Sequence, residues 1–441
     1  MRLPVPASVS RCVLTWPLAC LLAGGCNRLG VDSAGALSAD TAGTVSTRSV
    51  PETSDEDALR EKLDRVIEMN RDRHMSPQSN SAWQIVHGML AYGPELQIND
   101  DGKLVAALEW LLSGHELKGW ELKAGDGWEW LKADDKGLRE RLKCKTLDTT
   151  WELTASDTGL GDKGLKDIVD PGSKTGEGHD DQWLGYLAQC GMELKTPIKI
   201  RGVTEPFTIA DLLTQAQWDV HVGMELTWTL MGLGHYLPLD AKWTASDGKE
   251  WTLEELVEAE AFQDLNTSSC GGTHRLYGIT VAVNRYLNAG NQLKGGWKTA
   301  DDKIQKAIED AQACQQPDGG FSTEFFKRPS SSPDLALRIN TSGHMFEFLT
   351  VALNDEQLRQ PWMTRALEFL LDAFEATAGD DLECGGLYHA AHGLILYRER
   401  RFGQPSSSSP ALRQASRGAK SADPAENGAT TSQGAEPSAK E

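Results

Sequence analysis

Hydrophobic residues between positions 54 and 402 follow two helical patterns that alternate along the chain. In the first pattern the apolar side chains fall on one face of a helix and carboxylates fall on the other, as in Ala107-Leu108-Glu109-Trp110-Leu111-Leu112. This spacing predicts amphipathic helices that pack through one side. The segments with this pattern are residues 54–72, 103–113, 208–220, 252–265, 300–315 and 361–377.

The second pattern is apolar on nearly every side and is rich in glycine and aromatic residues. A helix that is hydrophobic all round is surrounded by other protein segments. The segments with this pattern are residues 81–92, 179–190, 222–237, 272–287, 341–353 and 385–398.

Alternation of the two patterns predicts an all-α fold, an α/α toroid of about six helical hairpins. The enclosed helices would form an inner barrel of parallel helices, and the amphipathic helices would wrap it. Parallel inner helices place their N-termini at one end, where unpaired N–H groups and helix dipoles favour an anion or developing negative charge. Residues 117–178 are too many for a hairpin loop, so we expect a long insertion or lid over one mouth.

The first 26 residues have the pattern of an export signal. Arg2 and Arg11 accompany a short apolar run over 12–25 that is too short to span a bilayer. The run Leu22-Ala23-Gly24-Gly25-Cys26 resembles the lipobox of bacterial lipoproteins, with the leucine one place further from the cysteine than is usual. The resemblance implies a lipid on Cys26 that anchors the exported protein to a membrane of the cell envelope, on its periplasmic or surface side. An ordinary cleaved signal peptide is the alternative.

Two segments lack the apolar residues that a packed core needs. Residues 27–53 are rich in Ser, Thr, Ala, Gly and Asp and predict a flexible linker. Residues 403–441 have a similar composition and predict a disordered tail. The folded part is therefore expected over residues 54–402.

The charge balance excludes some classes of partner. The chain has 44 basic and 64 acidic residues, which gives a net charge of −20. Nucleic-acid binding requires a basic face that neutralises phosphates, so no nucleic-acid partner is expected. Besides the membrane, the expected partners are a small-molecule or polymer substrate, or another protein.

One motif near the end of an amphipathic segment resembles that of a known superfamily. Cys314-Gln315-Gln316-Pro317-Asp318-Gly319-Gly320-Phe321 resembles the C-Q-x-x-D-G-G-F repeat of the prenyltransferase and terpene (squalene–hopene) cyclase superfamily. The resemblance implies the α/α-toroid fold. It does not carry the activity, because the chain lacks the D-x-D-D acid motif and Asp381-Leu382-Glu383-Cys384 lacks the D-x-C spacing of the prenyltransferase zinc site.

The chain also resembles, more faintly, uncharacterised bacterial lipoproteins labelled as ADP-ribosylation-factor-directed GTPase-activating proteins. Those activators are built on a C-x-x-C zinc finger, and no cysteine pair of this chain has that spacing. The label therefore implies no activity for this chain.

Polar residues gather near the predicted starts of the enclosed helices, where they would face one cavity. The candidates for catalysis are Asp181, Glu225, His274, His344 and His389. The candidates for the substrate pocket are His179, Asp180, Gln182, His221, Arg275 and Asn340.

These residues allow two kinds of chemistry. His274 and His389 with Cys384 could bind a metal, with zinc the expected ion. Alternatively, a carboxylate such as Asp181 or Glu225 could act with a histidine as acid or base in hydrolysis or elimination on a polymer. Structural roles are open too: Asp180 and Asp181 can favour a helix N-terminus, Cys270 and Cys384 can form a disulfide, and His87, His235 and His392 can pack in the core.

Two functions are compatible with these residues. The first is an envelope enzyme, a hydrolase or lyase, that acts on a glycan or isoprenoid-like substrate at the mouth of the toroid. The second is a non-catalytic surface lipoprotein that uses the toroid as a platform for a partner.

Overall fold

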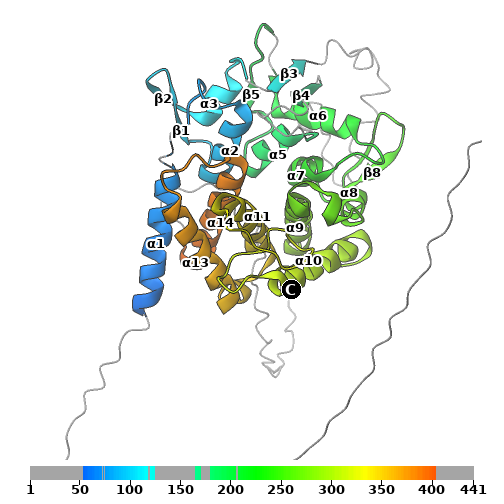
Figure 1. Ribbon diagram of the computed structural model, residues 1–441. Helices are drawn as coiled ribbons and strands as arrows, with labels where there is room; N and C mark the ends of the chain where they lie inside the picture. Colours follow the sequence, from blue (N-terminus) through cyan, green and yellow to red (C-terminus); the bar gives the residue numbers. More distant parts are fainter. Residues whose placement is uncertain are drawn as a thin grey trace, which may run out of the picture. The chain divides into compact units, whose positions relative to one another are not determined.

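The computed structural model describes residues 53–71, 73, 75–117, 120–124, 164–169, 179–204 and 207–403. Within these ranges the chain is mostly helical, as predicted for an all-α fold (Figure 1). No helix among them is long and apolar enough to cross a membrane. The predicted export signal with Cys26, nearly all of the linker and tail, and most of the 117–178 insertion lie outside the described residues.

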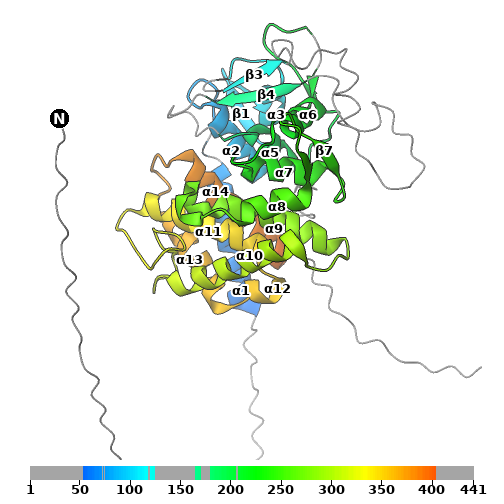
Figure 2. The ribbon, with the colours of Figure 1, turned by 90° about the vertical axis from the view of Figure 1, so that its right-hand side faces the viewer.

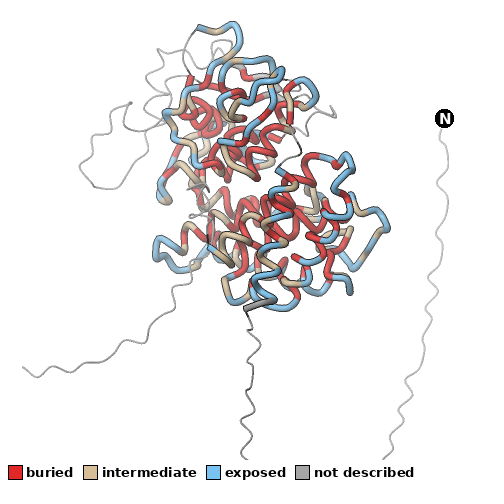
Figure 3. Tube along the Cα trace, turned by 90° about the vertical axis from the view of Figure 1, so that its left-hand side faces the viewer, coloured by how far each residue is buried: buried red, intermediate tan, exposed pale blue. Residues whose placement is uncertain are grey.

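The segments predicted to be apolar on every side form the buried helices of the protein (Figure 3). Each packs against the next one in chain order, and the last packs against the first. These helices are α2 (Ala82–Tyr92), α5 (Gln182–Gln189), α7 (Thr227–Tyr236), α9 (Thr273–Asn288), α11 (Leu335–Ala352) and α14 (Cys384–Phe402).

Helices α11 and α14 form a close pair because glycines face the neighbouring backbone. A Cβ on Gly343 would lie 2.3 Å from the Cβ of Ala390, and a Cβ on Gly393 would lie 3.0 Å from the Cα of Glu347. The contacts advance together along both helices, so α11 and α14 run in the same direction. This direction brings the N-terminal turns of α14 alongside the middle of α11.

The amphipathic segments form helices that bury one face, except for α6, in which every residue from Ile209 to Gln217 is buried. In α10, Trp297, Ile304 and Ala311 are buried, whereas Lys298 and Asp302 are exposed and form an ion pair. The helices of this kind are α1 (Thr53–Arg71), α3 (Ala107–Leu112), α6 (Ile209–Asp219), α8 (Leu253–Ala261), α10 (Gly295–Cys314) and α13 (Pro361–Ala376). A short helix, α12 (Asp355–Leu358), connects α11 to α13.

The sequence patterns did not predict the β-ribbons that connect some helices. The described residues hold four two-stranded antiparallel ribbons, and β4 lies beside α6 (Figure 2). The ribbons are β1 (Gln97–Asp100) with β2 (Lys103–Ala106), β3 (Trp120–Ala124) with β4 (Leu165–Val169), β5 (Pro197–Ile198) with β6 (Phe207–Thr208), and β7 (Lys242–Thr244) with β8 (Glu250–Thr252).

Several predicted helix boundaries were wrong: α10 begins at Gly295 rather than at residue 300, α8 ends at Ala261 rather than at residue 265, and three others have a local cause. The prediction of a helix from residue 103 failed because Asp101 and Gly102 adopt left-handed φ angles of 49° and 87°, which turn the chain back and pair residues 103–106 with β1. Helix α7 starts at Thr227 rather than at residue 222, since a turn containing Gly223 at φ 91° precedes it. Helix α11 starts at Leu335, six residues before the predicted 341, after the cap Asp334.

The Cys314–Phe321 motif holds α10, α11 and α13 together. Asp318 accepts two hydrogen bonds of 2.8 Å from the guanidinium of Arg338 on α11. Gln315 donates a 2.8 Å hydrogen bond to the carbonyl oxygen of Trp362 on α13. A Cβ on Gly319, whose φ is 94°, would lie 2.2 Å from the carbonyl oxygen of Arg365, so the turn requires glycine. The motif therefore has a structural role in this chain.

Candidate metal centre

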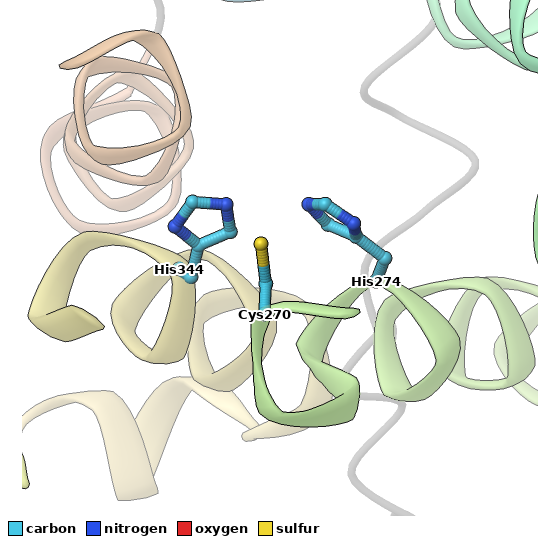
Figure 4. Close-up of side chains that lie close together, drawn as sticks. All are labelled: Cys270, His274 and His344. Carbon is cyan, nitrogen blue, oxygen red and sulfur yellow. The ribbon is translucent and has the colours of Figure 1, made fainter. Parts of the chain in front are cut away.

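Cys270, His274 and His344 bring one sulfur and two imidazoles together (Figure 4). Their potential ligand atoms lie within 4.8 Å of one another, and Figure 4 shows the cysteine sulfur between the two rings. Cys270 and His274 are half-buried and His344 is buried. Sulfur and imidazole nitrogen are the donors that zinc prefers in proteins.

A strained turn before α9 positions Cys270. This turn is the 3-10 helix η4 (Ser269–Gly272), in which Cys270 has φ 48° and is followed by Gly271 and Gly272 at φ 63° and 78°. A left-handed conformation costs a non-glycine residue about 1–2 kcal/mol, so the surrounding packing must hold it. Phe325 supplies part of that packing, because its Cγ would lie 2.2 Å from a Cβ on Gly271.

A backbone hydrogen bond orients the His344 ring. Its Nδ1 lies 2.7 Å from the carbonyl oxygen of Asn340, one turn earlier in α11. A carbonyl oxygen accepts, so Nδ1 carries a proton and Nε2 is the nitrogen that can bind a metal once its own proton is lost. Although burial opposes the charged form, the neighbouring Cys270 and Glu347 raise the pKa of His344 to about 9.

Glu347 joins two histidines of α14 within the core. Its Oε2 lies 2.7 Å from Nδ1 of His389, and its Oε1 lies 2.5 Å from Nδ1 of His392. Burial alone would raise the pKa of Glu347, but the two imidazoles hold it well below its usual range. Sequence reasoning missed Glu347, although a lone carboxylate in an otherwise apolar helix was an available signal.

The three histidines His274, His344 and His389 form one cluster. Ring centroids are 5.0 Å apart for His274–His344, 4.4 Å for His344–His389 and 4.7 Å for His274–His389. Nε2 of His274 lies 3.2 Å from Nε2 of His389. Burial and the neighbouring imidazoles lower the pKa of His274 and that of His389. Neutral imidazole is the form that binds metals.

His87 lies beside this cluster, with both nitrogens already engaged. Its Nδ1 lies 2.6 Å from the carbonyl oxygen of Trp83, and its Nε2 lies 2.7 Å from the hydroxyl of Tyr186. The ring is 5.2 Å from that of His389. His87 is thus a neutral core histidine, as its place in an apolar segment suggested, and forms a wall of the cluster.

His179 and Glu225 form a second pair near His274. Nδ1 of His179 lies 2.8 Å from Oε2 of Glu225, and the His179 and His274 rings are 6.3 Å apart. Burial would raise the pKa of Glu225, but the hydrogen bond from His179 lowers it. Trp228 lies 5.4 Å from the His274 ring and forms a wall beside this pair.

Asp180 and Asp181, at the start of α5, differ in their exposure to solvent. Asp181 is buried with φ 58°, and its Oδ2 accepts a 2.5 Å hydrogen bond from the hydroxyl of Thr229. Burial and the nearby Asp167 raise the pKa of Asp181 to about 8. Asp180 is exposed. Gln182 donates a 3.1 Å hydrogen bond to Tyr186 and so belongs to the His87 wall.

Two other pocket candidates have structural partners. His221 is exposed in the turn before α7, where its Nδ1 lies 2.9 Å from the carbonyl oxygen of Asp219. Arg275 forms a buried 2.5 Å ion pair with Glu260. Asn340 contributes its backbone to the site, through the carbonyl oxygen that orients His344.

Cys384 is not among the residues that the structure groups as metal donors. It begins α14, where burial raises the pKa of its thiol to about 12. Cys270 provides the sulfur of the group instead. Both cysteines are free, so the alternative of a Cys270–Cys384 disulfide was wrong.

Carboxylates cap two of the buried helices, Asp334 at α11 and Glu383 at α14. Glu383 caps α14 and accepts 2.8 Å hydrogen bonds from the backbone N–H groups of Gly385 and Gly386.

Comparisons of the chain with family models, curated proteins and solved structures found no match.

Proposed function

We propose that this chain is a zinc-dependent enzyme of the hydrolase or lyase class. The supporting observation is the convergence of the Cys270, His274 and His344 donor atoms within 4.8 Å of one another. Three protein donors and one remaining position for water or substrate are the usual pattern of catalytic zinc. Bound zinc would lower the pKa of water and polarise a substrate oxygen.

The proposal includes an α/α toroid. Three features support it: the cyclic order in which α2, α5, α7, α9, α11 and α14 contact one another, the parallel direction of α11 and α14, and the one-sided burial of amphipathic helices such as α10. In such a toroid Cys270 and His274 lie at the N-terminal end of the inner helix α9, and His344 lies midway along α11.

The charges around the donors favour a neutral substrate, such as a glycan, over an isoprenoid diphosphate. Glu225 and Glu383 are carboxylates in this region, and Arg275 is already neutralised by Glu260. A diphosphate requires free Arg or Lys side chains or a metal–phosphate clamp. The His179–Glu225 pair is suited to orient a hydroxyl group of the substrate.

The lipobox-like segment ending at Cys26 supports a place in the cell envelope, with the enzyme tethered to a membrane by lipid. The acidic net charge is compatible with this arrangement, because a lipid anchor does not require a basic surface. Metabolic labelling with a palmitate analogue tests it. We expect incorporation in the wild type and none in Cys26→Ser.

The test of the function is metal content and activity of tag-free protein. We expect about one zinc per chain in the wild type, and little in Cys270→Ser or His274→Ala, because each removes a donor. His221→Ala is the matched control, since His221 is an exposed histidine outside the centre.

Activity is measured by release of reducing ends from a panel of envelope polysaccharides. We expect turnover that chelation abolishes and zinc restores. If the protein binds no zinc and the donor variants change only the melting temperature, the chain is a binding platform and the proposal is wrong.

A further inference from the structure

Glu347 and His389 carry an inference about the centre that deepens the proposed function and rests on it. We infer that His389 is a further metal donor, which completes the zinc shell in the resting protein and gives up its place to water or substrate, and that Glu347 is its positioning residue. Three observations support this. Hydrogen bonds fix which nitrogen of His389 carries a proton, the charge of Glu347 is buried, and the Nε2 atoms of His274 and His389 lie close together.

The hydrogen bonds determine which nitrogen of His389 is free. A carboxylate accepts, so Glu347 receives the Nδ1 proton of His389 on one oxygen and that of His392 on the other. Nε2 of His389 is left as an acceptor, and it lies 3.2 Å from Nε2 of His274. This carboxylate–histidine arrangement is the one that orients metal-ligating histidines in proteins.

The charge of Glu347 needs a compensating cation. Its side chain is 5% exposed, and in the described part of the chain its oxygens meet imidazole nitrogens with no Lys or Arg beside them. A buried carboxylate requires a compensating positive charge, which protonated imidazole supplies when the metal is absent and the metal ion supplies when it is bound. A divalent ion bound to the Cys270 thiolate and to His389 would balance both negative charges, and the centre would be neutral.

His389 lies outside the group Cys270, His274 and His344, whose donor atoms are all within 4.8 Å of one another, but its spacing from His274 fits a metal shared by these two residues. Zinc–nitrogen bonds of about 2.0–2.1 Å at a tetrahedral angle place two ligand nitrogens about 3.3 Å apart. The Nε2 atoms of His274 and His389 are 3.2 Å apart. The same separation suits an N–H···N hydrogen bond between the two rings in the metal-free protein, and a bound metal ion would replace the shared proton.

The experiment is a zinc titration against a competing chromophoric chelator, with tag-free wild type, Glu347→Gln and His389→Ala. We expect Glu347→Gln to weaken zinc binding by about 10- to 100-fold with unchanged stoichiometry, because the carboxylate that orients His389 is lost. We expect His389→Ala to weaken it at least as much. Asp167→Asn is the matched control: it neutralises another buried carboxylate, which accepts from the backbone N–H of Trp183, and should leave zinc affinity unchanged.

Cobalt substitution separates ligation from general destabilisation. In the cobalt protein, His389→Ala should change the d–d bands while the sulfur-to-cobalt charge-transfer band of Cys270 stays. Should Glu347→Gln not fold, His389→Ala carries the same test. Wild-type zinc affinity and unchanged cobalt bands in His389→Ala would overturn the inference and leave the proposed function intact. A wild type that binds no zinc would instead refute the proposed function.

Discussion

Nε2 of His274 lies 3.2 Å from Nε2 of His389, although 115 positions separate the two residues in the chain. The contact joins the first turn of α9 to the second turn of α14, and α11 supplies His344 between them. Packing through glycines lets the helices approach closely enough for the imidazoles to meet. The centre is therefore a product of the whole helical arrangement.

Zinc should stabilise the folded protein. A ligand that binds the folded state alone adds about 2.7 kcal/mol at 100 times its Kd. We expect chelation to lower the melting temperature of the wild type and zinc to restore it. The His274→Ala/His344→Ala double variant should melt at the same temperature with and without chelator. An equal effect of chelator on both proteins would place the metal elsewhere.

Gly343 should be essential for the contact between α11 and α14. Gly343→Ala places a Cβ 2.3 Å from that of Ala390 and 2.8 Å from its Cα, so the helices must separate. Overpacking of this kind costs about 1–3 kcal/mol. Urea unfolding should show a loss in this range together with weaker zinc binding. Gly379→Ala is the control, because a Cβ there meets nothing within 4 Å.

Asp181 should make the protein less stable as pH rises from 4 to 8. The pKa of Asp181 is raised from 3.8 to about 8, chiefly by burial. Below pH 4 the carboxyl is protonated in both states. Between the two pKa values the unfolded state loses its proton and the folded state keeps it, so the free energy of unfolding falls by up to about 1.4 kcal/mol per pH unit.

The Asp181→Asn variant tests whether the free energy of unfolding falls as pH rises, as predicted. The variant should be about as stable as the wild type at pH 4 and more stable at pH 8, because the amide mimics the protonated acid. Urea unfolding at pH 4, 6 and 8 gives the comparison. If the free energies of unfolding of the two proteins change in parallel from pH 4 to pH 8, the pKa of Asp181 is not raised.

Arg338 should contribute strongly to stability through the Cys314–Phe321 motif. It is buried, donates two hydrogen bonds to Asp318, and stacks 4.2 Å from the Phe369 ring. Charge-assisted hydrogen bonds and cation–π contact together predict a loss of about 2 kcal/mol in Arg338→Ala. Arg328→Ala removes an exposed ion pair with Glu324 and should cause no measurable change in urea unfolding.

The sequence predicted the helices well where the apolar pattern was unambiguous. The apolar runs of α9 and α14 and their leading histidines lie where the pattern placed them, since burial on every side leaves a clear signal. Strand β2 (Lys103–Ala106) was missed because the sequence pattern joined it to α3 in a single predicted helix over residues 103–113. A left-handed turn at Asp101 and Gly102 separates the two elements, and periodicity does not reveal it.

The candidate centre was predicted in part. His274, His344 and His389 were identified as site residues, because polar side chains at the starts of apolar helices stand out. The sulfur was assigned to Cys384, although the structure groups Cys270 with the histidines. The two cysteines precede similar Gly-Gly turns, and the φ of 48° that places Cys270 has no sequence signature.

The most direct measurement of the central claim is the zinc K-edge absorption spectrum of the purified, tag-free protein. The account predicts one sulfur scatterer at about 2.3 Å and nitrogen scatterers at about 2.0–2.1 Å. The sulfur shell should disappear in Cys270→Ser and persist in Cys384→Ser. A first shell made of oxygen atoms, or a sulfur shell that survives in Cys270→Ser, would contradict the assignment of the centre.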